Sequence, residues 1–167
     1  MDTDEELAAI VALLGGQEPL STFFSSFEHD FSLGPFKSHH DLHLLAQRGL
    51  PSVRYAFFLK VLGMPESQVL LPLKLPVRGV RNRRKALRLL GQVESERILR
   101  LVQAVCLARQ ACGNLQLALR WLSKPNEELR GASPFALLDT SFGAQLVENW
   151  LRVRLRQRAE FEARVNG

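Results

Sequence analysis

The stretch from residue 113 to residue 140 constrains the fold most, because a helix start or stop signal occurs every few residues. The stop signals are Gly113, Pro125 and Gly131. Glycine can end a helix in the left-handed conformation, and proline cannot continue one. Each stop precedes a side chain that can cap the next helix, namely Asn114, Asn126 and Ser133, and Thr140 or Asp139 can open the last one. The pattern predicts a series of short helices followed by an amphipathic helix from Phe142 to about Arg158.

This stretch resembles the C-terminal toxin-binding domain of the Xre/MbcA/ParS antitoxins, a family with a fixed spacing of apolar, Pro, Gly and Thr positions. The matching residues here are Trp121, Leu122, Pro125, Asn126, Leu129, Gly131, Pro134, Leu137, Leu138, Thr140, Gly143 and Val147. Almost all of them are caps, stops or apolar side chains, so they identify the module. The contacts that carry its function are expected on its variable surface.

Charge is distributed unevenly along the chain. Residues 1–36 carry seven acids and no Lys or Arg, whereas residues 37–167 carry all 22 basic residues against ten acids. Half of the phenylalanines lie in the acidic segment, at Phe23, Phe24, Phe27, Phe31 and Phe36. An acidic arm so rich in aromatic residues is expected to pack on the basic body or on a second copy.

Helical periodicity also occurs outside residues 113–140. Helices are expected at Asp41–Arg48, at Pro51–Leu62, and at Ser95–Cys112, where an apolar stripe from Ile98 to Cys106 faces a core. No alternating apolar run predicts a strand. The predicted fold is all-α, a multi-helix bundle divided into an arm (1–40), a helical domain (41–112) and a toxin-binding domain (113–167). Trp121, Leu137, Leu138 and Val147 are expected in the core, and Phe142 and Leu146 are placed on the inner face of the last helix.

A basic cluster occupies the middle of the chain. A short helix to about Leu73, a turn at 74–76 and a helix from Val77 to about Leu89 have the length of an Xre-like helix-turn-helix, at about 65–89. No acid occurs between Ser67 and Val93. The candidate DNA-binding residues are Lys74, Arg78, Arg81, Arg83, Arg84, Lys85 and Arg88, with Arg81 and Arg84 expected on an exposed face. Pro72 and Lys74 depart from the usual motif, so a degenerate helix-turn-helix stays open.

Signatures of catalysis are absent from the sequence. It contains no Gly-rich phosphate loop, nucleophile elbow or zinc-protease motif, so no enzyme activity and no cofactor are expected. His39, His40 and His43 lack further ligands at a recognisable spacing, and no metal site is predicted. Cys106 and Cys112 are read as unbridged core residues. No apolar run is long enough to cross a membrane and no signal peptide is recognised, which predicts a cytoplasmic protein.

The resemblance implies an antitoxin that inhibits a RES-type, NAD-consuming or ADP-ribosylating toxin and represses its own operator. We place the toxin-binding residues at Trp150, Arg154 and Arg158, which share one face of the last helix. Trp150 is equally compatible with a core position. A homodimer is expected, together with a larger complex with the toxin. The alternatives are a stand-alone helix-turn-helix regulator without a toxin, and a toxin-binding adaptor with a degenerate helix-turn-helix.

Overall fold

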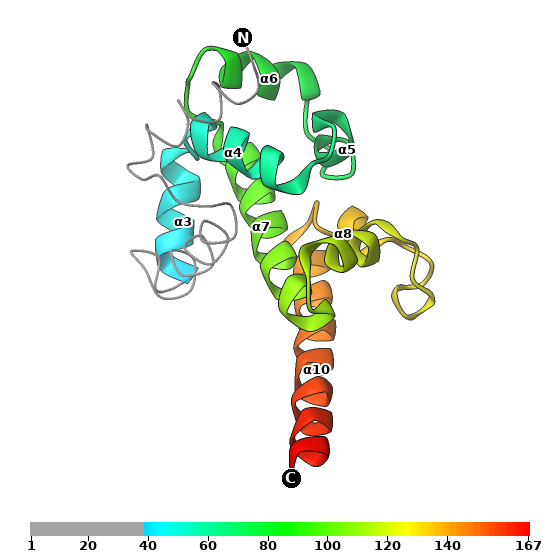
Figure 1. The fold of residues 1–167 in the computed structure, drawn as a ribbon. Coiled ribbons are helices and arrows are strands. Elements are labelled where there is room, and N and C mark those ends of the chain that lie inside the picture. Colours follow the sequence, from blue (N-terminus) through cyan, green and yellow to red (C-terminus); the bar gives the residue numbers. More distant parts are fainter. Residues whose placement is uncertain (1–38) are drawn as a thin grey trace. The chain divides into compact units, whose positions relative to one another are not determined.

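The computed structural model describes residues 39–167, and this part of the chain is built from helices (Figure 1). They are α3 (His39–Arg48), α4 (Ser52–Leu62), α5 (Glu66–Leu70), α6 (Val77–Lys85), α7 (Gln92–Cys112), α8 (Leu115–Ser123), the 3-10 turn η1 (Glu127–Leu129), α9 (Pro134–Leu137) and α10 (Ser141–Asn166). Extended pairing within residues 39–167 is limited to one isolated bridge between Pro51 and Leu89. The prediction of an all-α fold is confirmed, and the predictions for the acidic arm up to residue 38 lie outside the described residues.

Backbone contacts divide the chain into two units. Of the described residues, unit 1 comprises 39–70 and 75–96, and unit 2 comprises 71–74 and 97–167. The division passes through α7 between Glu96 and Arg97. No helix of the described residues is long and apolar enough to cross a membrane.

The core of unit 1 forms around α4, which buries Tyr55, Phe57, Phe58 and Leu62. Both α4 and α5 pack against α6, whose single buried residue is Val80. Gly49 has φ of +95°, and a Cβ atom there would lie 2.4 Å from the carbonyl oxygen of Leu90. Only glycine fits this approach, which lets the Leu90 N–H donate to the Leu50 carbonyl at 2.9 Å.

The two helices of the expected helix-turn-helix are shorter than predicted. α5 ends at Leu70 instead of Leu73, and α6 ends at Lys85 instead of Leu89. Lys74 and Leu87 stop the two segments with φ of +53° and +51°. Two backbone hydrogen bonds close the turn after each helix. Glycine usually occupies the left-handed position in this type of helix end, but here the position is held by Lys74 and by Leu87.

Unit 2 packs the second part of α7 with α8, α9 and α10. The stripe predicted on α7 is buried, with Ile98, Leu101, Val102, Val105 and Cys106 at most 9% exposed. α8 and α10 both pack against α9. Leu138, Val147 and Leu151 are fully buried, as the sequence predicts for Leu138 and Val147.

Four predicted caps hold the short helices of unit 2. The side chains of Asn114, Asn126, Ser133 and Thr140 accept bonds from backbone N–H groups two or three residues ahead, at 2.9 to 3.2 Å. Thr140, and not Asp139, opens α10. A Cβ atom on Gly143 would lie 1.9 Å from the carbonyl oxygen of Leu137, so the first turn of α10 needs a glycine.

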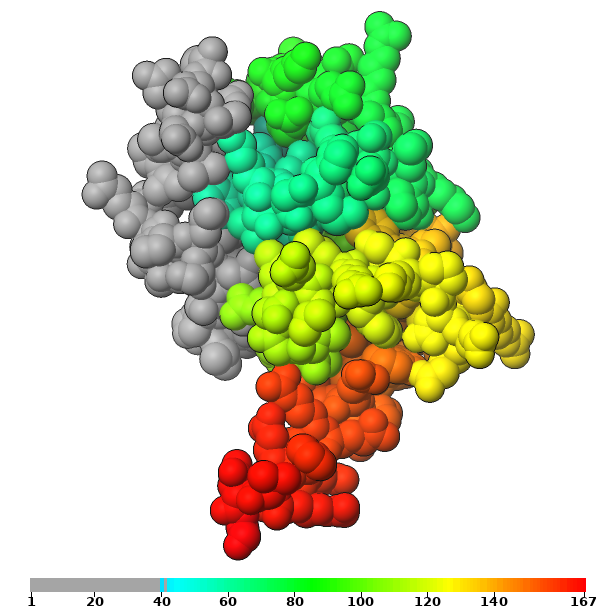
Figure 2. Space-filling model, turned by 45° about the vertical axis from the view of Figure 1, so that its right-hand side comes forward, coloured from blue at the N-terminus to red at the C-terminus, as the bar shows by residue number. Residues whose placement is uncertain are grey.

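The last helix differs from the prediction in length and in orientation. α10 continues to Asn166, eight residues beyond the expected end. Phe142 is 85% exposed and Leu146 is 51% exposed, so their predicted place on the inner face is wrong. The core side of α10 is the face of Val147 and Leu151, which the four-residue spacing of Phe142, Leu146 and Trp150 did not indicate. The final turns project past the rest of unit 2 (red in Figure 2).

Candidate functional site

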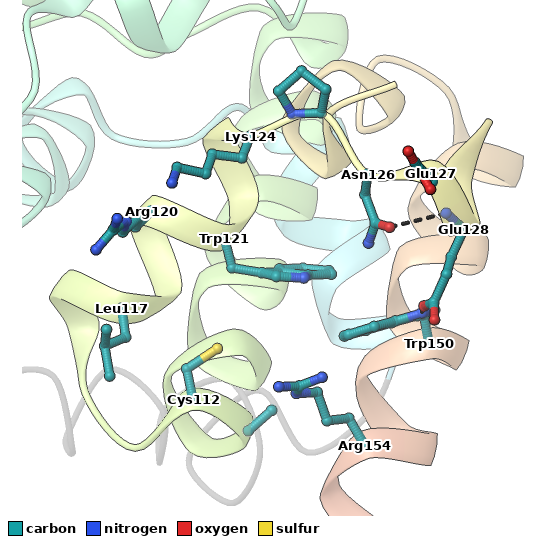
Figure 3. A pocket seen from close by; sticks show the side chains of 12 residues that line it. Cys112, Leu117, Arg120, Trp121, Lys124, Asn126, Glu127, Glu128, Trp150 and Arg154 are labelled. Carbon is teal, nitrogen blue, oxygen red and sulfur yellow. Dashed lines mark hydrogen bonds between the residues drawn. The ribbon is translucent and has the colours of Figure 1, made fainter. Parts of the chain in front are cut away.

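Unit 2 contains an open pocket of about 780 Å³ between α8, η1 and α10 (Figure 3). Its lining comes from the end of α7 (Ala111, Cys112), from α8 and the residue after it (Leu117, Arg120, Trp121, Lys124), from the next turn (Pro125 to Glu128), and from α10 (Trp150, Arg154). We call this site the tryptophan pocket. It joins Trp150 and Arg154, which were predicted to bind a toxin, to residues of the capped turns.

The two tryptophans of the chain stack on each other in this pocket. The ring centroids of Trp121 and Trp150 lie 4.7 Å apart with an interplanar angle of 20°. The guanidinium carbon of Arg154 lies 5.2 Å from the centroid of the Trp150 ring, within the range of a cation–π interaction. The indole N–H of Trp150 donates to the Glu128 carboxylate. These contacts hold two large, partly exposed aromatic rings in one orientation, which suits them to bind a partner.

Both tryptophans are partly buried, so neither is a core residue or a fully exposed one. Trp121 was expected in the core, but it is only partly buried and forms a wall of the pocket. Trp150 was compatible with either role, and it is also partly buried, between the Trp121 ring and the Arg154 side chain. The sequence contains no signal for this pair because the two residues lie 29 positions apart on different helices, α8 and α10, and their rings meet only in the folded unit.

Cations dominate one side of the pocket. Arg120, Lys124 and Arg154 are exposed, and among the described residues no acid forms an ion pair with Arg120 or Lys124. Glu127 and Glu128 lie across the pocket, where Glu128 accepts the Trp150 N–H (Figure 3). Unpaired cations beside aromatic faces favour an anionic or acidic partner.

Cys112 does not add a nucleophile to the pocket. It is partly buried and carries a free thiol, whereas Cys106 is buried as predicted. Burial raises the pKa of Cys112, and the nearby Arg154 and Arg158 offset this only in part. The thiol therefore stays protonated near neutral pH, and protonated thiols react poorly.

Arg158, the third predicted toxin-binding residue, has structural contacts. Its guanidinium donates to the Gln110 carbonyl oxygen at 3.0 Å and pairs with Glu162 at 2.9 Å. The first contact satisfies a free carbonyl at the C-terminal end of α7, where a cation also interacts favourably with the helix dipole. Arg158 therefore stabilises the joint between α7 and α10, next to the pocket and not in its lining.

Three of the six cations in the basic segment of unit 1 form ion pairs with two acids at its borders. Glu66 accepts bonds from Arg81 and Arg84 at 3.0 and 3.1 Å. Burial alone would raise the pKa of Glu66, but the bonds from Arg84 and Arg81 hold it below its usual range. Arg83 pairs with Glu94, whose second oxygen accepts the Gly91 N–H at 2.7 Å. We call these five side chains, Glu66, Arg81, Arg83, Arg84 and Glu94, the arginine cluster.

The remaining predicted DNA-binding residues are divided between the two units. Arg78, Lys85 and Arg88 are exposed in unit 1, and no acid of the described residues pairs with them. Lys74 belongs to unit 2, where its ammonium lies 2.6 Å from the Asp139 carboxylate. The acid-free run between Ser67 and Val93 gave no hint of this neutralisation, because Glu66 and Glu94 lie immediately outside it.

No group of His, Cys, Asp and Glu suited to a metal ion occurs between residues 39 and 167. The rings of His40 and His43 lie 6.4 Å apart, and the side chain of His39 is outside the described set.

Comparison with known proteins places the pocket within a known domain. A sequence model of the antitoxin Xre/MbcA/ParS C-terminal toxin-binding domain matches residues 107–153. The chain is also similar to a protein of Pseudomonas putida named Antitoxin Xre, with 33% identity over 92 residues, which cover 53% of this chain and 58% of that protein. The chain thus spans little more than half the length of that curated relative. The resemblance to Xre/MbcA/ParS-type antitoxins is confirmed for the C-terminal module, and eleven of the twelve residues that line the pocket fall inside the matched segment.

Proposed function

We propose that this chain, which carries a toxin-binding domain of the Xre/MbcA/ParS antitoxin type, is the antitoxin of a type II toxin–antitoxin pair and holds its toxin through the tryptophan pocket. The observation that carries the proposal is the overlap between the matched domain and the pocket lining. The pocket also has the composition of an interface hot spot, in which aromatic and arginine side chains dominate.

The three predicted toxin-binding residues have different roles in this proposal. Trp150 and Arg154 provide the contact surface, because both remain accessible while their mutual contact fixes their orientation. Arg158 keeps α10 joined to the end of α7. The family resemblance favours a RES-type toxin that consumes NAD or transfers ADP-ribose. The cationic face of α10 suits a surface that normally binds an anionic dinucleotide, and covering that surface would inhibit such a toxin.

The first test is to express the adjacent reading frame with and without this protein. We expect that frame to kill cells alone and to be tolerated when both proteins are made.

The second test compares Arg154→Glu with Arg156→Glu, a matched charge reversal on another face of α10. Arg154→Glu should abolish co-purification and restore toxicity at an unchanged melting temperature, whereas Arg156→Glu should still protect. Equal protection by both variants would remove Arg154 from the interface.

We further propose that unit 1 binds operator DNA through the exposed cations Arg78, Lys85 and Arg88, and that the protein acts on paired half-sites as a homodimer. Arg81 and Arg84 are excluded from this test because both hold Glu66. Arg78→Glu with Lys85→Glu should remove the gel shift of the operon's own promoter and flatten its salt dependence. Light scattering should give a dimer mass. A wild-type protein that fails to shift the promoter at low salt would favour the adaptor with a degenerate helix-turn-helix.

A further inference from the structure

The tryptophan pocket has the size and the side-chain composition of a small-molecule site. Its volume of about 780 Å³ falls within the roughly 300–1,000 Å³ that such sites have. The stacked indoles of Trp121 and Trp150 form an aromatic platform inside it, and their mutual contact fixes its orientation. A planar ring gains stacking energy on a platform of this kind, because every aromatic base presents a flat π-face. The platform therefore favours a ligand that carries a planar ring.

Two cations lie together on one side of this platform. Arg120 and Lys124 are exposed, and neither forms an ion pair with an acid of residues 39–167 (Figure 3). They stand four positions apart at the end of α8, so two like charges lie one turn apart and repel each other. An anionic group bound between them removes this repulsion. Arg and Lys are the side chains with which proteins bind phosphate, and two of them side by side suit a diphosphate.

Asn126 adds a hydrogen-bond donor on the other side of the pocket. Its side-chain oxygen accepts the Glu128 N–H at 3.0 Å as the cap of η1, so the amide nitrogen has to face the other way. That nitrogen points toward the Trp121 ring, and no described residue accepts a bond from it (Figure 3). An amide donor held beside an aromatic platform can bond a ring nitrogen or a carbonyl oxygen of a stacked base.

The acids of the pocket give the site a polarity. Glu127 and Glu128 lie on the Asn126 side, across from Arg120 and Lys124 (Figure 3). Their carboxylates repel an anionic group and accept bonds from hydroxyl and amino groups. An anion is therefore directed to the end of α8, and a neutral ring with donors and acceptors at its edge is directed to η1.

We infer that the tryptophan pocket binds a nucleoside diphosphate, with its base against the indoles beside Asn126 and its phosphates on Arg120 and Lys124. This class of ligand joins a planar, hydrogen-bonding ring to a strongly anionic group in one molecule, in the order in which the pocket offers their partners. The inference concerns the free protein and does not depend on the proposed function. If the toxin also binds through this pocket, the nucleotide and the toxin exclude each other.

Tryptophan fluorescence measures this binding directly, because both tryptophans of the chain line the pocket. The probe is ADP, titrated into the full chain without any toxin, with excitation at the long-wavelength edge of indole absorption, where adenine does not absorb. We expect saturable quenching with a dissociation constant below about 0.1 mM. Adenosine lacks the phosphates and inorganic diphosphate lacks the ring, so each should bind at least about tenfold more weakly than ADP.

Charge reversal tests the phosphate end. Arg120→Glu with Lys124→Glu should weaken ADP binding by more than about tenfold and leave the weak binding of adenosine unchanged. Arg130→Glu with Arg156→Glu makes the same change of charge at two exposed residues outside the pocket lining, and ADP binding should not change. Circular dichroism should show that both double variants keep the helix content of the wild type.

An exchange of amide for carboxylate tests the base end. Asn126→Asp keeps an oxygen that caps η1 but removes the amide donor. It should weaken the binding of adenosine, which is neutral and therefore reports the loss of the donor without charge repulsion. Asn114→Asp makes the same exchange at the cap of α8, outside the pocket lining, and should leave adenosine and ADP binding unchanged.

Three results would overturn the inference. One is the absence of saturable quenching by ADP. Another is inorganic diphosphate that binds as tightly as ADP, which would leave a site for anions in general. The third is a short single-stranded oligonucleotide that binds more tightly than ADP and is released by the charge reversal at Arg120 and Lys124, which would assign the pocket to nucleic acid.

Discussion

The arginine cluster of unit 1 and the tryptophan pocket of unit 2 both contain several basic side chains, but they differ in whether carboxylates pair with those side chains. In the cluster Glu66 and Glu94 take up Arg81, Arg83 and Arg84, and the two carboxylate side chains are each only 8% exposed. In the pocket Arg120 and Lys124 stay without an acidic partner among the described residues. A run of cations in a sequence therefore shows where charge is concentrated, but the nearby acids decide whether it is available to a partner.

The largest expected effect comes from breaking the cluster. Glu66→Gln leaves two guanidinium groups without their shared carboxylate, and we expect a loss of about 2 kcal/mol of unfolding free energy. This value is below that of a fully buried pair because the Arg81 and Arg84 side chains are 45% and 28% exposed. Urea titration measures the loss. Glu127→Gln at the edge of the pocket is the control and should cost under about 0.5 kcal/mol. Similar losses of unfolding free energy in Glu66→Gln and Glu127→Gln would show that the carboxylate of the cluster is no more important for stability than one at the pocket edge.

Acid titration sharpens the same contrast. Because the folded state lowers the pKa of Glu66, the pair stabilises the fold above the unfolded pKa of about 4.3 and this contribution is lost as pH falls through the folded value. The difference in unfolding free energy between wild type and Glu66→Gln should be constant from neutral pH down to about 5 and shrink below about 4. A difference that grows in acid would mean that the carboxylate does not act through its charge.

A smaller effect is expected in the pocket. Trp150→Phe keeps an aromatic ring against Trp121 but removes the N–H that Glu128 accepts, and the expected cost is about 1 kcal/mol. A double-mutant cycle with Glu128→Ala, which removes the acceptor, should recover most of that energy as coupling. Absence of coupling would show that the bond does not contribute in solution, and that the contacts with Trp121 and Arg154 are sufficient to orient the ring.

The smallest effect tests a feature that both regions share. Leu87 follows α6 and Arg130 follows η1, and both have a left-handed backbone with φ of +51° and +56°. Leu87→Gly and Arg130→Gly should each stabilise the fold by roughly 0.5–1 kcal/mol, because glycine adopts this conformation without strain. Thermal unfolding measures both. Equal gains would show that the two regions differ in how charge is paired and not in backbone strain.

Much of the fold could be predicted because its signals are local. The caps at Asn114, Asn126, Ser133 and Thr140 each bond to an N–H two or three residues away, so the sequence around each position is sufficient to identify them. The same holds for the buried stripe of α7, which follows from helical periodicity. The length of α10 was underestimated because its last turns carry no apolar stripe and no strong stop signal.

The sequence by itself determined the all-α class, the order of the short capped helices and the resemblance of the C-terminal module to a toxin-binding domain. Tertiary structure alone decided how Trp121 meets Trp150, how Arg158 reaches Gln110 across 48 positions, and how Glu66 neutralises arginines 15 and 18 positions away. The physical reason is the range of the interactions. A cap depends on neighbours within one turn, whereas a pair between helices depends on which faces pack together, and that is settled only when the whole unit buries its core.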